Sequence, residues 1–212
     1  MTADNVASIN QLREKRPALS SNQVRVLLLL DRSASMKGHE EGVMTELRSF
    51  LGGLRSAFPG AHCLLTLVQF AATAQLCALL QPLEKVPIEY QAIDEGTALW
   101  DAIAFLLNLE KSRYEPPIFC VFATDGEENC SEEASFQQVQ AMKSCREEWG
   151  NWSFIWLNWQ GKPSRAERAL RVECIDSPIA KMGEGFSEVT RRMTREFHRL
   201  RATRRLLLKG GR

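Results

Sequence analysis

The sequence predicts an α/β fold with a doubly wound, mostly parallel sheet of about six strands, one antiparallel edge strand, and helices on both faces. Three observations support this class. Short apolar runs alternate with segments of helical spacing along the chain. The runs at residues 24–30 and 118–123 are almost entirely apolar and lead into an aspartate, as strands buried on both faces do. Two neighbouring runs are joined by too few residues for a parallel crossover.

Length and composition fit one domain. The chain has 212 residues, of which 44% are hydrophobic and 25% charged, as in ordinary globular proteins. We expect a polar N-terminal leader at residues 1–22, the domain at 23–200, and a basic C-terminal tail at 201–212. No stretch approaches the roughly 20 apolar residues that span a bilayer. The N-terminus lacks the order of a secretory signal. The six cysteines form no C-x-x-C pair, so we expect free thiols in a cytoplasmic protein.

The first half of the domain contains a strand, a helix and a hairpin. The apolar run 24–30 is too short for a helix and reads as the first strand. Apolar residues at positions 43, 47, 50, 51 and 54 have helical spacing, and Pro59-Gly60 ends that helix. Strand candidates 63–70 and 73–80 are separated only by Ala71-Ala72, which predicts an antiparallel hairpin and an edge strand. The loop 82–95 then leads to Thr97.

The second half repeats strands and helices. A helix is expected from Ala98 to about residue 111, and the strand that follows ends at Asp125. We predict the next helix from about Ser131, with Glu133 early enough to favour its positive end. Residues 152–159 and 172–175 are the remaining strand candidates. Apolar residues at positions 186, 189, 193, 197 and 200 mark a closing helix.

The loop after the first strand carries candidate metal ligands. Asp31, Ser33 and Ser35 follow the strand directly, at the sheet edge where α/β proteins bind ligands. Alternating oxygen donors without Cys or His suit a hard cation such as Mg²⁺. A structural alternative remains for each residue, because aspartate, serine and threonine are also common turn and N-cap residues. Thr97, for example, could cap the helix that starts near Ala98.

Three separate motifs together resemble the von Willebrand factor A (VWA) family and its metal-ion-dependent adhesion site. They are the D-x-S-x-S run from Asp31, the Gly96-Thr97 pair, and Asp125 after the second buried strand. The resemblance implies that one cation is held by Asp31, Ser33, Ser35, Thr97 and Asp125, a complete set. Ala34 stands where many relatives have glycine, and the two residues are similarly small. The chain is similar to single-domain intracellular VWA proteins of bacteria and phages.

The resemblance implies a binding function rather than catalysis. Asp31 and Asp125 supply two charges, so a bound Mg²⁺, or Mn²⁺ or Ca²⁺ in its place, would accept a further anionic oxygen. In the family, an Asp or Glu of a protein partner supplies that oxygen. We therefore expect a cytoplasmic adaptor, not an enzyme, whose partner could be an AAA+ ATPase or a stress-response protein. Acidic residues near the loops, Glu40, Glu41, Glu127 and Glu128, tune the site or simply form a solvated face.

Two other functions stay open. A metal-assisted phosphohydrolase would need a base, and His39 is the histidine nearest to the loop in sequence. The sequence contains no glycine-rich phosphate loop. RNA or DNA could bind the basic C-terminal segment, where residues 191–212 carry nine Lys or Arg and one acid, Glu196. The segment can equally be the polar face of the last helix. Its end, Leu206 to Arg212, weakly resembles the tail of ubiquitin-like modifiers.

Overall fold

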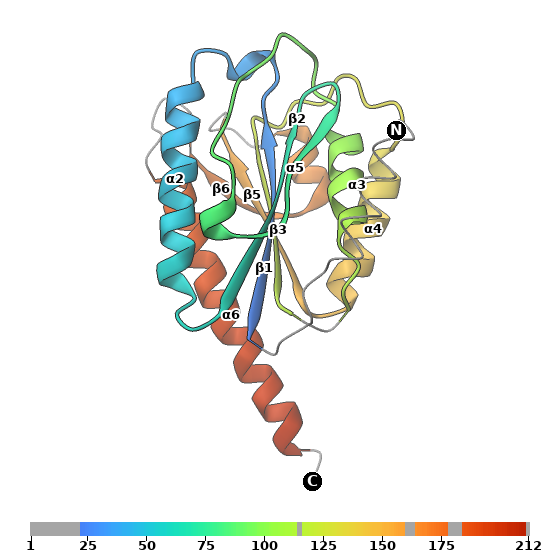
Figure 1. Cartoon of the computed structure of the whole chain (residues 1–212). Coiled ribbons are helices and arrows are strands. Elements are labelled where there is room, and N and C mark those ends of the chain that lie inside the picture. Colours follow the sequence, from blue (N-terminus) through green and yellow to red (C-terminus); the bar gives the residue numbers. More distant parts are fainter. Residues whose placement is uncertain (1–21, 114–115, 160–163, 178–183, 211–212) are drawn as a thin grey trace.

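A single mixed sheet forms the centre of the molecule (Figure 1). The computed structural model describes residues 22–113, 116–159, 164–177 and 184–210, with side chains as far as residue 200. Its strands run in the order β3-β2-β1-β4-β5-β6. Their bounds are β1 (Gln23–Asp31), β2 (His62–Phe70), β3 (Ala74–Pro82), β4 (Ile118–Thr124), β5 (Trp152–Asn158) and β6 (Glu173–Asp176). The predicted doubly wound α/β class is confirmed.

All neighbouring strands pair in parallel except β2 and β3. The antiparallel β2–β3 hairpin places β3 at the edge of the sheet, as the short connection predicted. Its register shifts between Leu65 and Val68. There the buried Thr66 hydroxyl accepts a hydrogen bond from the backbone N–H of Leu80, which has a positive φ of 48°. The Thr66 side chain therefore satisfies a backbone group that the irregular register leaves outside the ladder.

Helices cover both faces of the sheet. On one face lie α2 (Glu40–Ala57) and α6 (Gly185–Gly210); on the other lie α3 (Leu99–Leu109), α4 (Phe136–Glu148) and α5 (Arg165–Leu170) (Figure 1). Two short 3₁₀ turns, η1 (Ala34–Met36) and η2 (Leu83–Lys85), complete the described elements. Because β1 is central, Leu28 and Leu30 pack into the core under α2 and α6. Leu27 and Leu29 pack into the opposite core, which explains the unbroken leucine run.

The start of α4 was predicted wrongly. The helix begins at Phe136 instead of about Ser131, and its first turn contains no acidic residue. The N–H groups of Glu132, Glu133 and Ala134 donate instead to the carboxylate of Asp101 in α3. Because those amides already have a partner, the chain turns before Ser135 caps the helix in a capping box with Gln138. Glu133 therefore precedes the helix and is not part of its first turn.

Helix α5 was not predicted at all, although the sequence contains its start signal. The Ser164 hydroxyl accepts a hydrogen bond from the N–H of Glu167, and the Glu167 carboxylate accepts one from the backbone N–H of Ser164. This Ser-x-x-Glu capping box is visible in the sequence. The helix is only six residues long and ends at Arg171 in a left-handed conformation, so it offers little apolar periodicity to detect.

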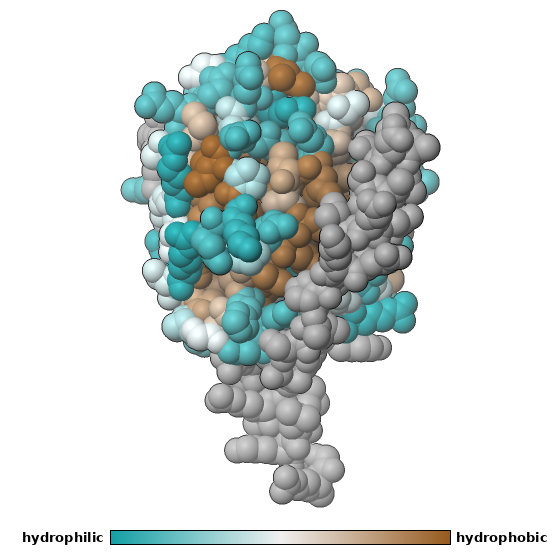
Figure 2. All heavy atoms as spheres, viewed as in Figure 1, coloured by the Kyte–Doolittle hydropathy of each residue, from teal (hydrophilic) through white to brown (hydrophobic). Residues whose placement is uncertain are grey.

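The last helix, α6, continues through Gly210 and extends past the body of the molecule, away from the carboxyl ends of the parallel strands (Figure 1). The predicted leader lies outside the described residues, apart from residue 22, and the boundary at residue 200 stays a prediction. In the described part of the chain, no helix has the length and apolarity needed to cross a membrane. Figure 2 shows hydrophobic side chains along the β3 side of the molecule and a mostly hydrophilic surface over the loops at its upper end.

Candidate metal centre

The candidate ligands lie at the carboxyl ends of β1 and β4, the two central strands. From β1 the sheet continues to β2 and β3 on one side and to β4, β5 and β6 on the other, so the order of strands reverses between β1 and β4. Open α/β sheets bind ligands at such a reversal of strand order. Leu30 pairs with Ala123, so the next residues, Asp31 and Thr124, leave the sheet side by side.

Asp31 is fully buried, and both of its carboxylate oxygens have hydrogen-bond donors. Oδ1 accepts from the N–H of Ser33 at 2.9 Å, and Oδ2 accepts from the Thr124 hydroxyl at 2.6 Å. Burial raises the pKa of Asp31 to about 6, with a smaller contribution from the charge of Asp125, while the Thr124 and Ser33 hydrogen bonds oppose the rise. The hydrogen bonds therefore offset only part of the cost of burying the ionised carboxylate.

The hydroxyls of Ser33 and Ser35 lie 3.2 Å apart in the loop after β1. Ser33 is buried and precedes η1, but its side chain makes no capping hydrogen bond. The residue at the N-cap of α2 is His39, so neither serine caps that helix. The capping alternative for these serines is therefore wrong, and their hydroxyls contact each other instead of a helix end.

Thr97 lies in the loop before α3 and is 3% exposed. Its N–H donates to Oδ1 of Asn129 at 2.8 Å, and its carbonyl accepts from the N–H of Asn129 at 3.1 Å. The N-cap of α3 is Ala98, without a side-chain bond, so Thr97 does not cap the helix. Its loop is joined to the Ser33 loop by a 3.2 Å bond from the N–H of Ala34 to the carbonyl of Glu95. Backbone bonds thus connect all three ligand-bearing loops.

Asp125 follows β4 and is 6% exposed. Its Oδ1 accepts a 3.2 Å hydrogen bond from the N–H of Glu127. Its charge makes a small contribution to the raised pKa of Asp31 and to the raised pKa of Tyr90, after the larger effect of burial on each. Among the residues that the structure describes, no Lys, Arg or His forms an ion pair with Asp31 or Asp125.

Three further residues support the site and were not predicted. Thr124 bonds Asp31 with its hydroxyl, which in turn accepts the N–H of Gly126 at 2.9 Å. The Tyr90 hydroxyl donates to the carbonyl of Asp31 at 2.6 Å. Asn129 holds Thr97. Thr124 could have been suspected because it precedes Asp125 directly, whereas nothing in the sequence pairs Tyr90 or Asn129 with the loops that they hold.

The chemistry of this donor set fits a hard divalent cation. It comprises three hydroxyls and two carboxylates that form no ion pair with the described part of the chain, and all of these oxygen donors lie at the same end of the sheet. A buried pair of like charges is costly unless a positive charge lies between or beside them. A cation such as Mg²⁺ would remove that cost, and Asp31, Ser33, Ser35, Thr97 and Asp125 are the residues that would hold it.

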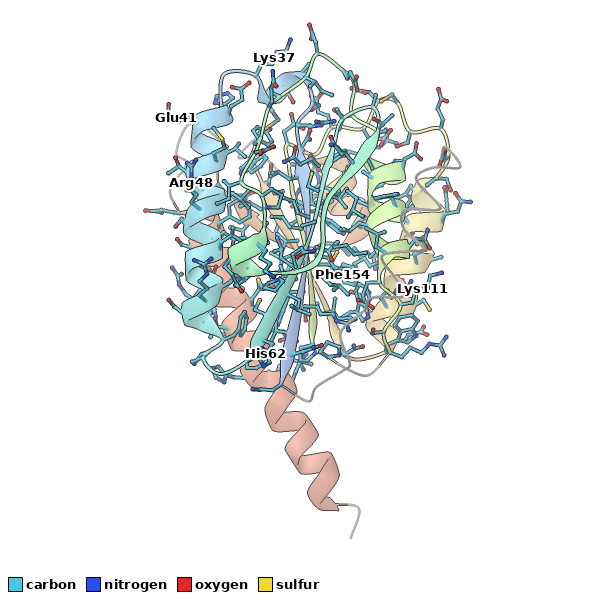
Figure 3. All side chains as sticks on the ribbon, in the orientation of Figure 1. Lys37, Glu41, Arg48, His62, Lys111 and Phe154 are labelled. Atoms are coloured by element: carbon cyan, nitrogen blue, oxygen red, sulfur yellow. The ribbon has the colours of Figure 1, made fainter. Side chains whose placement is uncertain are left out.

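The charged residues differ in whether they contact other groups and in how far they lie from the candidate metal centre. Lys37, which Figure 3 shows at the upper end of the molecule, pairs with exposed Asp94 at 3.0 Å. Glu128 is occupied, because its Oε2 accepts from the Ser131 hydroxyl at 2.7 Å and the Trp100 N–H at 3.0 Å. Glu41 points away from the sheet on the outer side of α2 (Figure 3). His62 lies at the opposite end of the sheet (Figure 3).

A second group of possible ligands lies beside β6. One ligand atom each from Glu167, Cys174 and Asp176 lies within 4.8 Å of the others. Asn158 donates its amide hydrogens toward Glu167 at 3.4 Å and Asp176 at 3.0 Å. Burial and the two carboxylates raise the pKa of the Cys174 thiol. The sequence did not indicate this group, because Glu167 belongs to the unpredicted helix α5. Like Asp31 and Asp125, its carboxylates accept hydrogen bonds from neutral donors, but its three possible ligands include a thiol and no hydroxyl.

Comparison with known proteins shows similarity in structure but not in sequence. No protein-family model and no curated protein sequence matches the chain. Proximal thread matrix protein 1 from the mussel byssus superposes with a TM-score of 0.61 at 15% identity, over 84% of this chain and 48% of that one. A structure of the same mussel protein described as having a zinc-occupied MIDAS motif gives a TM-score of 0.60 at 16% identity, over 82% and 46%.

A bacterial protein matches over nearly its whole length. The conserved hypothetical protein BatB from Bacteroides thetaiotaomicron superposes with a TM-score of 0.56 at 13% identity, over 84% of this chain and 99% of that one. These similarities show a VWA-like fold. The chain spans about half the length of the mussel protein, so the similarity concerns only that part of it.

Proposed function

We propose that this chain is a VWA protein that binds protein partners through a divalent cation held by Asp31, Ser33, Ser35, Thr97 and Asp125. The observation that carries the proposal is the buried Asp31 carboxylate beside Asp125, without a basic partner among the described residues, at the switch point of the sheet. The VWA-like fold and the metal-bearing structural neighbour support a metal-dependent interaction module.

The donor set favours Mg²⁺, with Mn²⁺ and Ca²⁺ as alternatives. Two carboxylates balance the formal charge of a dication, and with three neutral hydroxyls they make five oxygen ligands, one fewer than the six that Mg²⁺ prefers. Mg²⁺ prefers six oxygen ligands and commonly keeps water, which an Asp or Glu of a partner can replace. Thr124 and the Ser33 N–H hold the Asp31 carboxylate in place for this role. Tyr90 fixes the backbone of the same residue.

The identity of the partner follows only from the family resemblance. An AAA+ ATPase or a stress-response protein in the cytoplasm remains our hypothesis. Hydrolysis is the less favoured alternative: it requires a base, and the candidate nearest in sequence, His39, is the N-cap residue of α2. Nucleic-acid binding through α6 is also less favoured, because part of its charge is paired. Arg191, Arg192 and Arg195 contact Glu188, and Arg199 contacts Glu196.

Affinity capture with and without the cation tests the proposal. The bait is the full chain, in Mg²⁺ or in EDTA, beside Ser35→Ala and Asp125→Ala. Ser56→Ala is the matched control, because Ser56 is exposed on α2 and bonds only the carbonyl of Gly52. We expect the same proteins to be captured by the wild type and the control in Mg²⁺, and lost with EDTA or either site variant. Capture that survives both variants and EDTA excludes bridging by the metal.

A further inference from the structure

Thr97 is the candidate ligand whose position depends most on other residues. Asp31 and Asp125 directly end or follow strands, so the sheet places them. Thr97 lies instead in an irregular stretch between η2 and α3. A ligand on such a loop needs contacts outside the loop to keep its hydroxyl in a fixed place.

Asn129 supplies those contacts by binding both the N–H and the carbonyl of Thr97. Its Oδ1 accepts the Thr97 N–H at 2.8 Å, and its own N–H donates to the Thr97 carbonyl at 3.1 Å. One residue thus binds both polar backbone groups of the ligand residue. Asn129 stands four positions after Asp125, so the two bonds join Thr97 to the loop that carries Asp125.

Gly96 makes this close approach possible. A Cβ on Gly96 would lie 2.7 Å from Oδ1 of Asn129 and 2.9 Å from Sγ of Cys130. Both distances are below those of real Cβ contacts. A side chain at this position would therefore displace the Oδ1 atom of Asn129 that accepts the Thr97 N–H. Gly96 is required here for space, whereas Gly126 in the same region has a positive φ of 83°.

Neighbouring residues of the same loop hold a different element. Glu128 and Ser131 both accept a hydrogen bond from the N–H of Trp100, each at 3.0 Å, in the first turn of α3. They satisfy amides of a helix that has no side-chain cap of its own. Asn129 bonds Thr97, whereas Glu128 and Ser131 bond the helix, so substitutions can separate the two roles.

We infer that Asn129 is a positioning residue of the metal centre, which fixes the Thr97 hydroxyl relative to Asp125 through its two hydrogen bonds, with Gly96 providing the space. The inference rests on the proposed function. It predicts that metal affinity depends on the Oδ1 acceptor of Asn129, although this atom is not a ligand. Outer partners of ligands typically contribute a factor of roughly 10 to 100 in metal affinity.

The test measures Mn²⁺ affinity by calorimetry and unfolding in EDTA for the same variants of the full chain. Asn129→Ala should weaken Mn²⁺ binding by roughly tenfold or more. Asn129→Asp combined with Glu127→Gln keeps the acceptor and the formal charge of the loop, so it should restore affinity to near the wild-type value. Ser131→Ala, which loses bonds to α3 but none to Thr97, should lower stability in EDTA with little effect on affinity.

Gly96→Ala is the second probe, because it keeps Asn129 and displaces it. We expect it to weaken Mn²⁺ binding as Asn129→Ala does. The inference is overturned if Asn129→Ala and Gly96→Ala both fold and bind Mn²⁺ as the wild type does, while Thr97→Ala does not. It is also overturned if the Asp variant binds as weakly as the Ala variant. If Thr97→Ala and Asp125→Ala both leave Mn²⁺ binding unchanged, the proposed metal centre itself is wrong.

Discussion

The Thr124 hydroxyl donates a 2.6 Å hydrogen bond to Oδ2 of Asp31, although the two residues are 93 positions apart. Both are fully buried at the ends of neighbouring central strands. The bond favours the ionised form of Asp31, while burial raises its pKa to about 6. The ionised carboxylate would therefore be stabilised by a bound cation, since it forms no ion pair with any residue that the structure describes.

Loss of that bond should weaken the metal centre. Thr124→Val keeps the shape of the side chain but removes the donor to Asp31 and the acceptor of the Gly126 N–H. An unsatisfied buried group costs roughly 1–3 kcal/mol, so we expect lower stability together with weaker Mg²⁺ binding. Thr124→Ser keeps the hydroxyl and serves as the control. Equal Mg²⁺ affinities of the Val and Ser variants, by calorimetry, would show that the hydroxyl is irrelevant.

Asp31→Asn should stabilise the protein in EDTA while it abolishes Mg²⁺ binding. The folded pKa of Asp31, about 6, lies above its reference value of 3.8. Protonation of this group therefore favours the folded state below pH 3.8, and that contribution is lost as pH rises through 6. The difference between the two pKa values lowers the free energy of unfolding by on the order of 3 kcal/mol at neutral pH.

Urea unfolding in EDTA at a series of pH values measures the effect. The asparagine variant should be more stable than the wild type at pH 7.5, and the gap should close toward pH 4. With Mg²⁺ added, the order should reverse, because only the wild type gains stability from the bound ion. A wild type that is the more stable of the two in EDTA at pH 7.5 would contradict the assigned cost of the buried charge.

Arg25 and Glu110 form a buried ion pair with side chains only 2% and 1% exposed. Arg25 is near the start of β1, and Glu110 follows the last residue of α3, so the pair lies at the end of the sheet remote from the candidate metal centre. Arg25→Met removes the guanidinium from the buried Glu110 carboxylate, which keeps the N–H groups of Lys111 and Ser112, and loss of one partner of a buried pair should cost about 3–5 kcal/mol. Denaturation should show this loss, and Mg²⁺ affinity of the folded variant should stay as in the wild type.

Asp101 belongs to α3, but its side chain binds the turn that precedes α4. Its carboxylate accepts the N–H groups of Glu132, Glu133 and Ala134. Asp101→Ala should therefore destabilise the protein by about 1–2 kcal/mol, as loss of a helix cap does. Hydrogen exchange should become faster in residues 132–138 in particular. Unchanged exchange there would mean that the carboxylate does not hold this turn.

Most of the fold could be predicted from the sequence, because hydrophobic burial determines which segments form strands and helices. The leucine run of β1 can only be a strand with a core on each side, and the residue that ends it must lie at the sheet edge. The short connection after Phe70 likewise left only an antiparallel partner for β2. The start of α4 could not be obtained in this way, since Asp101 competes for its amides from another helix.

The candidate site was predictable in part for the same reason. Asp31 and Asp125 follow buried strands, so local pattern places them at one edge. Thr97 was predicted as a ligand only from the family resemblance. Local pattern could not place it, because its loop is held by Asn129, 32 positions further along the chain. The supporting bonds of Thr124 and Tyr90 join residues that no local pattern connects.

Anomalous diffraction from a crystal grown with Mn²⁺ would locate a bound ion and so decide whether the five candidate ligands hold one cation. We expect one anomalous peak within ligand distance of Asp31, Ser33, Ser35, Thr97 and Asp125, and no such peak in the Asp125→Ala variant. The same data examine the other candidate group. A peak only at Glu167, Cys174 and Asp176, with none beside Asp31, would contradict the account.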